Sequence, residues 1–209
     1  MLIVEVMKPD PITISERTKL NEAYQLMHEK GIRHLPVVKN WKLVGLVTDR
    51  DLRLATSKLA KHPFSPDAEV GKIMSHPVNT IGPNDPVERA TQIMRELKIG
   101  CLPVVEEDQL VGIVTVTDLL DALLMLTGVH RPSGRLDVRL SNKPGELARL
   151  TTLLAERKLN IHSILTYPDK EGKIRLVLRI GTIEIKMLAE AICNAGFEVV
   201  WPIHIACVK

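Results

Sequence analysis

The chain has 209 residues, of which 45% are hydrophobic, 25% are charged and 3% are aromatic. These proportions are typical of a globular protein with an aliphatic core, and they exclude a disordered or fibrous chain. A net charge of +3 and so few aromatic side chains argue against nucleic-acid binding, which uses a concentrated basic face and stacking platforms.

The ends of the chain and its cysteines indicate where the protein works. The apolar segment at the start of the sequence is too short for a signal peptide, and a charged residue follows it too soon. No apolar run reaches the roughly 20 residues of a membrane span. The three cysteines are widely spaced and form no metal-ligand motif, so we expect reduced thiols, no metal and no cofactor. We therefore expect a cytoplasmic protein with no membrane partner. The cysteines are Cys101, Cys193 and Cys207.

The first part of the chain contains an internal duplication. Residues 7–55 align without a gap with residues that lie 67 positions later, and about 20 of the 49 aligned positions are identical. The best match sets Leu35-Pro36-Val37-Val38 against Leu102-Pro103-Val104-Val105, and Gly45 to Asp51 against Gly112 to Asp118. The two copies should therefore share one fold.

Each copy predicts the same series of elements. A short strand near Thr13 or Thr80 precedes an amphipathic helix, two strands joined by a polar turn, and a closing helix that begins at Asp51 or Asp118. Asp85 is expected to cap the second amphipathic helix, with Pro86 as its first residue. The helices are predicted from apolar residues at helical spacing: Leu20, Ala23, Tyr24 and Met27 in the first copy, and Val87, Ala90, Met94 and Leu97 in the second.

One copy alone, at roughly 50 residues, is too small to bury both faces of its sheet. The duplication therefore predicts that the copies pack face to face as one module. We place the first copy at 1–60 and the second at 61–128.

The tandem repeats, each with Pro-Val-Val and then Gly-x-x-Thr-x-x-Asp, resemble the CBS-domain pair, or Bateman module. The resemblance covers both copies from end to end. It implies a disc with up to two clefts for adenosine-containing ligands: AMP, ADP, ATP or S-adenosylmethionine.

The residues themselves are suited to such ligands. Thr48 stands where a helix begins, and the free amides of a first helical turn bind phosphate. The Asp51 carboxylate can accept hydrogen bonds from both hydroxyls of a ribose. An alternative is that Thr48 and Asp51 only form a capping box, with Asp in place of the usual Glu or Gln. Both interpretations can hold at once.

The two copies differ in charge at equivalent positions. Arg33, His34, Arg50 and Arg53 of the first copy correspond to Gly100, Cys101, Thr117 and Leu120 of the second. We expect one basic cleft edge, which holds phosphate near Arg33, His34 and Arg50, and one neutral edge. With the resemblance, the candidate nucleotide-binding residues are Thr13, Ile32, Arg33, His34, Thr48, Arg50, Asp51, Thr80, Ile99, Gly100, Cys101, Thr115 and Asp118.

After a connector at 129–134, the segment 135–209 predicts a second domain. Strands at 136–140, 161–167, 174–180 and 198–205 alternate with helices at 145–157 and 183–195, which gives the β-α-β-β-α-β order of a ferredoxin-like fold. The whole chain is thus expected to have an α/β (α+β) fold.

Asn142-Lys143-Pro144-Gly145 and Asn160-Ile161, with this topology, resemble the ACT domain. The resemblance implies that Asn142, Gly145 and Asn160 bind an amino acid or similar small ligand at an interface between ACT domains. An alternative is that Pro144 and Gly145 only start the helix, and that the domain only dimerises.

We find no nucleophile with a base, no converging carboxylates and no metal cluster, and so expect no enzyme. Two CBS motifs and one ACT domain resemble stand-alone regulators of the acetoin utilisation protein B type. The expected partners are small-molecule effectors, an unknown regulated protein, and further copies in a homodimer or higher homo-oligomer through the CBS and ACT domains. The alternatives are a ligand-free dimerisation scaffold and a transcription-regulating partner protein.

Overall fold

The computed structural model describes residues 1–203 and 205. The chain divides into two compact units, Met1–Leu120 and Asp121–Lys209, and the boundary falls inside helix α4 (Val116–Thr127). Both units combine helices with a sheet of antiparallel strands, which confirms the expected α/β (α+β) class. Within the described residues, the helices are too short or too polar to cross a bilayer.

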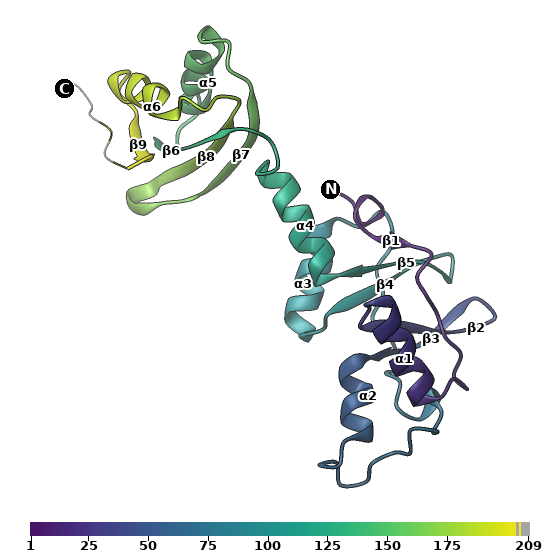
Figure 1. Cartoon of the computed structure of the whole chain (residues 1–209). Helices are drawn as coiled ribbons and strands as arrows, with labels where there is room; N and C mark the ends of the chain where they lie inside the picture. The colour runs from purple at the N-terminus through teal and green to yellow at the C-terminus, as the bar shows by residue number, and fades with distance from the viewer. Residues whose placement is uncertain (204, 206–209) are drawn as a thin grey trace. The chain divides into compact units, whose positions relative to one another are not determined.

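In the first unit, both copies contain a helix, a hairpin and a second helix in the same order, whereas strand β1 has only the isolated bridge between Leu46 and Ser75 as its counterpart (Figure 1). The strands expected at Thr13 and Thr80 form only as isolated parallel bridges, Ile14 to Val37 and Ile81 to Val104. The elements are η1 (Ile3–Glu5), β1 (Lys8–Pro9), α1 (Leu20–Lys30), β2 (His34–Lys39), β3 (Lys42–Thr48), α2 (Asp49–Thr56), η2 (Val70–Lys72), α3 (Val87–Leu97), β4 (Cys101–Glu106) and β5 (Gln109–Thr115), followed by α4.

The sheet of the first unit is built from two hairpins of equal geometry. Strands β2 and β3 form one hairpin and β4 and β5 the other, with β1 beside β5. Each hairpin contains one β-bulge, at Val37/Val38 and at Val104/Val105. Both turn residues of each hairpin have positive φ, as a tight two-residue turn requires. These residues are Asn40, Trp41, Glu107 and Asp108.

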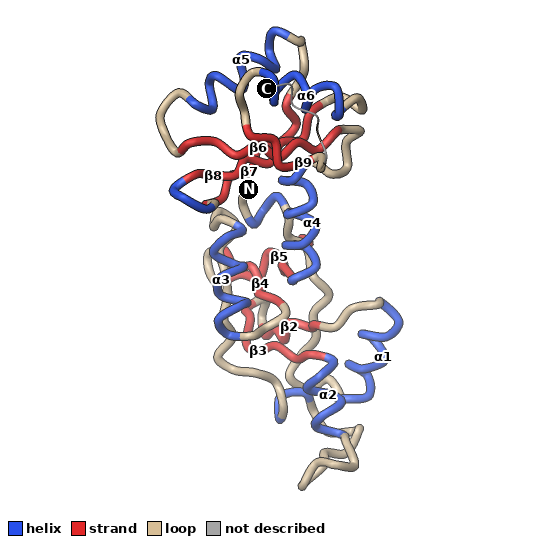
Figure 2. Tube along the Cα trace, turned by 90° about the vertical axis from the view of Figure 1, so that its left-hand side faces the viewer, coloured by secondary structure: helices blue, strands red, loops and turns tan. Residues whose placement is uncertain are grey.

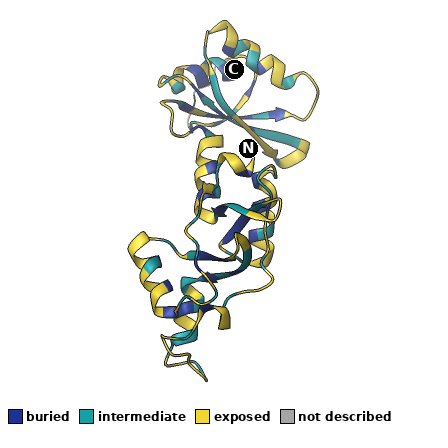
Figure 3. Cartoon of the chain, turned by 90° about the vertical axis from the view of Figure 1, so that its right-hand side faces the viewer, coloured by how far each residue is buried: buried dark blue, intermediate teal, exposed yellow. Residues whose placement is uncertain are grey.

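Each copy has its own apolar core, formed by its hairpin and its helices. Figure 3 shows the buried residues concentrated on the strands. Two residues predicted on the apolar helix faces lie outside these cores, because Tyr24 is 45% and Leu97 is 49% exposed. The other predicted core positions of these helices are buried: Leu20, Ala23, Met27, Val87, Ala90 and Met94.

The expected cap of α3 is wrong. Pro86, not Asp85, is the N-cap residue, and it makes no side-chain cap bond. Asp85 instead accepts a hydrogen bond from the Gly82 amide at 2.9 Å and pairs with Arg89. The Val87 amide at the start of the helix donates to the carbonyl of Met1. A tertiary contact with the N-terminal segment thus satisfies the amide that a local cap would have served.

The second unit has the β-α-β-β-α-β order expected from the sequence, with a four-stranded antiparallel sheet in the order β7-β8-β6-β9. Figure 2 shows both of its helices on one face of that sheet. Its core lies between the helices and this face. The elements are β6 (Gly134–Ser141), α5 (Glu146–Glu156), β7 (Ile161–Pro168), η3 (Lys170–Gly172), β8 (Lys173–Ile180), α6 (Ile185–Asn194) and β9 (Glu198–Trp201).

The end of the chain differs from the expectation in its last strand and in one cysteine. The last strand ends at Trp201 rather than at 205, and His204 and Cys207 lie outside the described residues. Cys193 is disulfide-bonded, so the expectation of a reduced thiol is wrong there, whereas Cys101 is a buried free thiol. Spacing along the sequence does not reveal which cysteines meet after folding.

Candidate functional site

Helix α2 begins with a complete capping box at the end of strand β3. The Thr48 amide and hydroxyl both donate to Asp51 Oδ2, at 2.9 and 2.7 Å, and the Asp51 amide donates to Thr48 Oγ1 at 3.2 Å. The alternative read from the sequence, a capping box, is therefore present. The box uses only Oδ2 of the carboxylate, and Asp51 is only partly buried. The Oδ1 atom lies outside the box.

The second copy repeats this geometry at Thr115 and Asp118. The Thr115 amide and hydroxyl donate to Asp118 Oδ2 at 2.7 and 2.6 Å. Asp118 differs from Asp51 in its surroundings, because it is only 7% exposed and its Oδ1 lies 3.9 Å from Nζ of Lys8. The two caps are alike, but their second oxygens have different neighbours.

A cavity of about 860 Å³ joins the two copies. This volume is within the range of small-molecule sites, which is about 300–1,000 Å³. The cavity is lined by Lys8, Gly31, Ile32, Arg33, His34, Leu46, Thr48, Asp49, Arg50, Asp51, Arg53, Ser75, Pro77, Val78, Asn79, Lys98, Ile99, Gly100, Cys101, Ile113, Thr115, Val116 and Thr117.

The lining follows the duplication but is not symmetric. Eighteen of its residues form nine pairs whose members lie 67 positions apart in the sequence. Equivalent residues of both copies therefore line the cavity. The five others have no equivalent in the lining: Asp51 and Arg53 of the first copy, and the segment Pro77–Asn79 of the second. Their equivalents, Asp118, Leu120 and 10–12, do not line it. The cavity therefore extends toward Asp51.

The lining is basic. Five permanent cations, Lys8, Arg33, Arg50, Arg53 and Lys98, face two carboxylates, Asp49 and Asp51, a balance of 5 − 2 = +3. Arg53 forms an ion pair with Asp49. We expected a neutral second edge from the sequence, and this expectation is wrong. Lys98 of the second copy lies on this edge, and Lys8 lies beside strand β5 of the same copy, whereas the equivalent residues on the first edge are Gly31 and Ser75. A ligand bound here would experience a positive potential on both sides.

Two titratable groups of the cavity are shifted by burial. Burial, and then the Arg33 charge, lower the pKa of His34 from its ordinary value, against the smaller opposing effect of Asp51. His34 therefore adds no charge to the lining at neutral pH. Burial raises the pKa of the Cys101 thiol to about 12. Cys101 thus contributes as a small apolar group and not as a thiolate.

Most of the predicted nucleotide-binding residues line this cavity, and three do not. Thr13 and Asp118 lie outside its lining, and Thr80 lines a smaller cavity of about 280 Å³ with Val44, His76 and other residues. Sequence reasoning missed Lys8, Lys98 and the segment 77–79. The repeat alignment offered a signal for Lys8, since it sets this lysine against Ser75 at the second position of the aligned stretch.

In the second unit, the three candidate amino-acid-binding residues lie at the ends of elements. Gly145 is the N-cap of α5 with φ 91°, a conformation that favours glycine. Asn142 is exposed in the loop before this helix, and the exposed Asn160 immediately precedes β7. The structure thus gives Gly145 the helix-starting role of the alternative interpretation.

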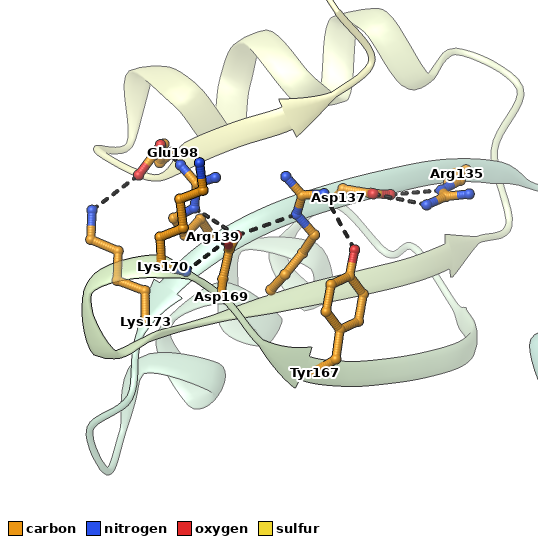
Figure 4. A network of polar contacts seen from close by, with 9 residues as sticks. Arg135, Asp137, Arg139, Tyr167, Asp169, Lys170, Lys173 and Glu198 are labelled. Carbon is orange, nitrogen blue, oxygen red and sulfur yellow. Dashed lines mark hydrogen bonds and ion pairs between the residues drawn. The ribbon is translucent and has the colours of Figure 1, made fainter.

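The sheet face opposite the helices of the second unit carries a network of ion pairs (Figure 4). Arg135 donates to both oxygens of the buried Asp137, at 2.7 and 2.9 Å. Asp169 accepts from Arg139 at 2.8 Å and lies 3.4 Å from Arg175. These acids neutralise arginines that the strand register sets side by side.

Comparison with known proteins connects both units to characterised domain families. The CBS domain model matches residues 3–58 and 70–125, and the ACT domain model matches residues 134–192. The CBS matches alone cover more than half of the chain.

Three solved structures resemble the CBS part, and each match covers 59% of this chain. The first is a putative acetoin utilization protein (AcuB) from Vibrio cholerae, 35% identical, with a TM-score of 0.52 over 90% of its chain. The CBS domain pair of protein MJ0100, in complex with 5′-methylthioadenosine and S-adenosyl-L-methionine, is 28% identical, with a TM-score of 0.53 over 95% of its chain. The third is CBSX2 in complex with AMP, 27% identical, with a TM-score of 0.52 over 96% of its chain.

The duplicated hairpins with their Thr-x-x-Asp caps, the ferredoxin-like second unit and the two family matches agree with one another. The chain belongs to the CBS domain family, as a tandem CBS pair followed by an ACT domain.

Proposed function

We propose that this chain is a non-catalytic regulatory sensor that binds an adenosine-containing ligand, AMP, ADP, ATP or S-adenosylmethionine, in the cavity between its CBS motifs. In this proposal the motifs occupy 1–60 and 61–128, and the ACT domain occupies 135–209. The Asp51 carboxylate accepts the ribose hydroxyls, and the basic side chains near it hold the phosphates or other polar groups.

The observation that carries the proposal is that Asp51 lines the cavity together with basic residues. Its carboxylate has one oxygen outside the capping box, and Arg33 and Arg50 belong to the same lining. The first-turn amides of α2 add donors for an anion. Ile32 and Val78 supply apolar surface for a base. The AMP complex and the S-adenosyl-L-methionine complex of the similar CBS structures support this choice of ligand class.

Isothermal titration with AMP, ADP, ATP, S-adenosylmethionine and adenosine tests the proposal. Asp51→Ala should weaken binding by about tenfold or more, since it removes hydrogen bonds to a charged acceptor. Asp118→Ala is the matched control, because it removes the same kind of cap from a residue outside the cavity lining. Absence of binding by the unaltered chain, or equal losses in both variants, would contradict the proposal.

The double variant Arg33→Ala, His34→Ala separates the phosphate contribution from the nucleoside contribution. It should lose the preference for AMP over adenosine and still bind adenosine. An unchanged preference would show that phosphate is not bound at this edge.

We also propose that Asn142, Gly145 and Asn160 bind an amino acid between ACT domains of a homodimer or higher homo-oligomer. Native mass spectrometry reports subunit count and retained ligand together. Thermal unfolding with each of the common amino acids, for the unaltered chain and for Asn160→Ala, tests the site. A shift that is identical in both would assign the ligand to another place.

At the level of the cell, the similarity to the Vibrio cholerae protein supports a role in acetoin utilisation. Expression of this chain in a bacterium that lacks its own such protein should restore growth on acetoin. Restored growth that persists with Asp51→Ala would instead favour a scaffold that needs no nucleotide.

A further inference from the structure

The two copies place Lys8 and Ser75 at the same backbone position. Lys8 pairs with Ile113 in the β1–β5 ladder, and Ser75 pairs with Leu46, with amide-to-carbonyl distances of 2.8 and 3.2 Å. Ser75 follows Lys8 by 67 residues, and Ile113 follows Leu46 by the same number. Both side chains belong to the cavity lining. The copies therefore differ in chemistry at one equivalent point.

The residue at this position determines whether a cation lies beside the second oxygen of the nearby capping carboxylate. Lys8 lies beside the hairpin of the second copy, and its Nζ is 3.9 Å from Asp118 Oδ1, the oxygen outside the box. The equivalent residue beside the hairpin of the first copy is Ser75, which cannot supply a cation. Within the described residues, Asp51 forms no ion pair that corresponds to the one between Lys8 and Asp118.

The two capping carboxylates also differ in burial. Asp118 is 7% exposed and does not line the cavity, whereas Asp51 is less buried and does. The ammonium group of Lys8 already stabilises the charge of the buried Asp118 carboxylate by an ion pair, and a ligand that approached this carboxylate would have to displace the lysine. A carboxylate with a free oxygen has no such competitor.

We propose that Lys8 closes the half of the cavity that belongs to the second copy, so that the chain binds one adenosyl ligand, on Asp51. The inference rests on the proposed nucleotide-binding function and adds the residue that selects between two otherwise equivalent carboxylates. In this proposal Lys8 forms an ion pair with Asp118 and so prevents it from binding a ligand. Ser75 cannot form such a pair, so the Asp51 carboxylate can accept hydrogen bonds from the ligand.

The reciprocal variants Lys8→Ser and Ser75→Lys test this selection by isothermal titration with AMP. The unaltered chain should bind one AMP per chain. Lys8→Ser should bind a second AMP, and this second binding should be lost when Asp118→Ala is added. Ser75→Lys should weaken the first site about tenfold or more, since its ammonium group competes for the carboxylate. Ser75→Met, of similar length but uncharged, should weaken it less.

The outcomes separate this inference from the proposed function. Two AMP molecules per unaltered chain, or one in both the unaltered chain and Lys8→Ser, would overturn the selection by Lys8 and leave nucleotide binding intact. Equal binding by Ser75→Lys and Ser75→Met would overturn the role of charge. Absence of AMP binding by the unaltered chain would overturn both. The Lys8 side chain is 68% exposed, so folding should tolerate its replacement, and a thermal unfolding curve of each variant checks this.

Discussion

The imidazole of His34 lies against Gly100, across the boundary between the two copies. A Cβ atom built on Gly100 would come within 2.9 Å of His34 Nε2. Gly100 is the residue of the second copy that corresponds to Arg33. The absence of a side chain in one copy therefore makes room for the histidine of the other.

Replacing Gly100 by alanine should displace His34 and weaken AMP binding. A side chain forced off its preferred rotamer costs about 0.5–1.5 kcal/mol, which raises the dissociation constant about two- to tenfold. Titration of Gly100→Ala, His34→Ala and the double variant gives a double-mutant cycle. In the His34→Ala background, the glycine substitution should have little further effect. Additive losses would mean that the alanine acts elsewhere.

The lowered pKa of His34 predicts a pH dependence of stability. Between this lowered pKa and 6.5, the unfolded chain binds more protons at this site than the folded chain, so the free energy of unfolding rises with pH. The stability contribution is present above about 6.5 and is lost as the pH falls below it. Urea unfolding of the unaltered chain and of His34→Gln from pH 5 to 8 measures the difference. A difference that does not change with pH would contradict the prediction.

Cys101 should resist alkylation in the folded protein. With its pKa raised to about 12 by burial, only about one thiol in 10,000 is ionised at pH 8, and the thiolate is the reactive form. Its side chain is also almost inaccessible, since the residue is 2% exposed. Mass spectrometry of the Cys101 peptide after iodoacetamide treatment, with and without guanidinium, should find labelling only in the unfolded sample. Rapid labelling of the native protein would show that the cavity opens at this residue.

The Arg135–Asp137 pair should stabilise the second unit because Asp137 is buried. Arg135→Ala leaves the buried carboxylate without its partner, which should cost about 1–3 kcal/mol, since the Arg135 side chain is 44% exposed and the pair is therefore partly solvated. Arg179→Ala is the matched control, since Arg179 is the cross-strand neighbour of Arg135, and it should cost less than Arg135→Ala because Asp137 keeps both of its hydrogen bonds from Arg135. Chemical unfolding compares the two. Replacing both partners, Arg135→Met with Asp137→Leu, should recover much of the loss.

The fold was predictable where local pattern and duplication agree. The aligned Pro-Val-Val and Gly-x-x-Thr-x-x-Asp stretches predicted the hairpins and the caps, and every helix and longer strand lies within a few residues of its expected place. The prediction failed at Asp85, because a backbone carbonyl of the distant N-terminus serves the first amide of α3. The sequence around α3 does not predict a contact with a residue more than 80 positions away.

The candidate site was predictable in its motif and not in its asymmetry. Thr48, Asp51 and the basic residues near them follow from the motif and from comparison of the copies. The environment of Asp118 does not, because the lysine beside it is more than 100 positions away in the sequence. Which carboxylate is covered and which is open depends on tertiary structure.

The β-bulges at Val37/Val38 and at Val104/Val105 occupy the same place in both hairpins. A bulge is a property of the backbone and outlasts the replacement of side chains around it. Both hairpins therefore bend at the same point of their Pro-Val-Val stretches, although the residues beside them differ in charge. The curvature of the two hairpins and the charge of the cavity lining are thus set by different residues.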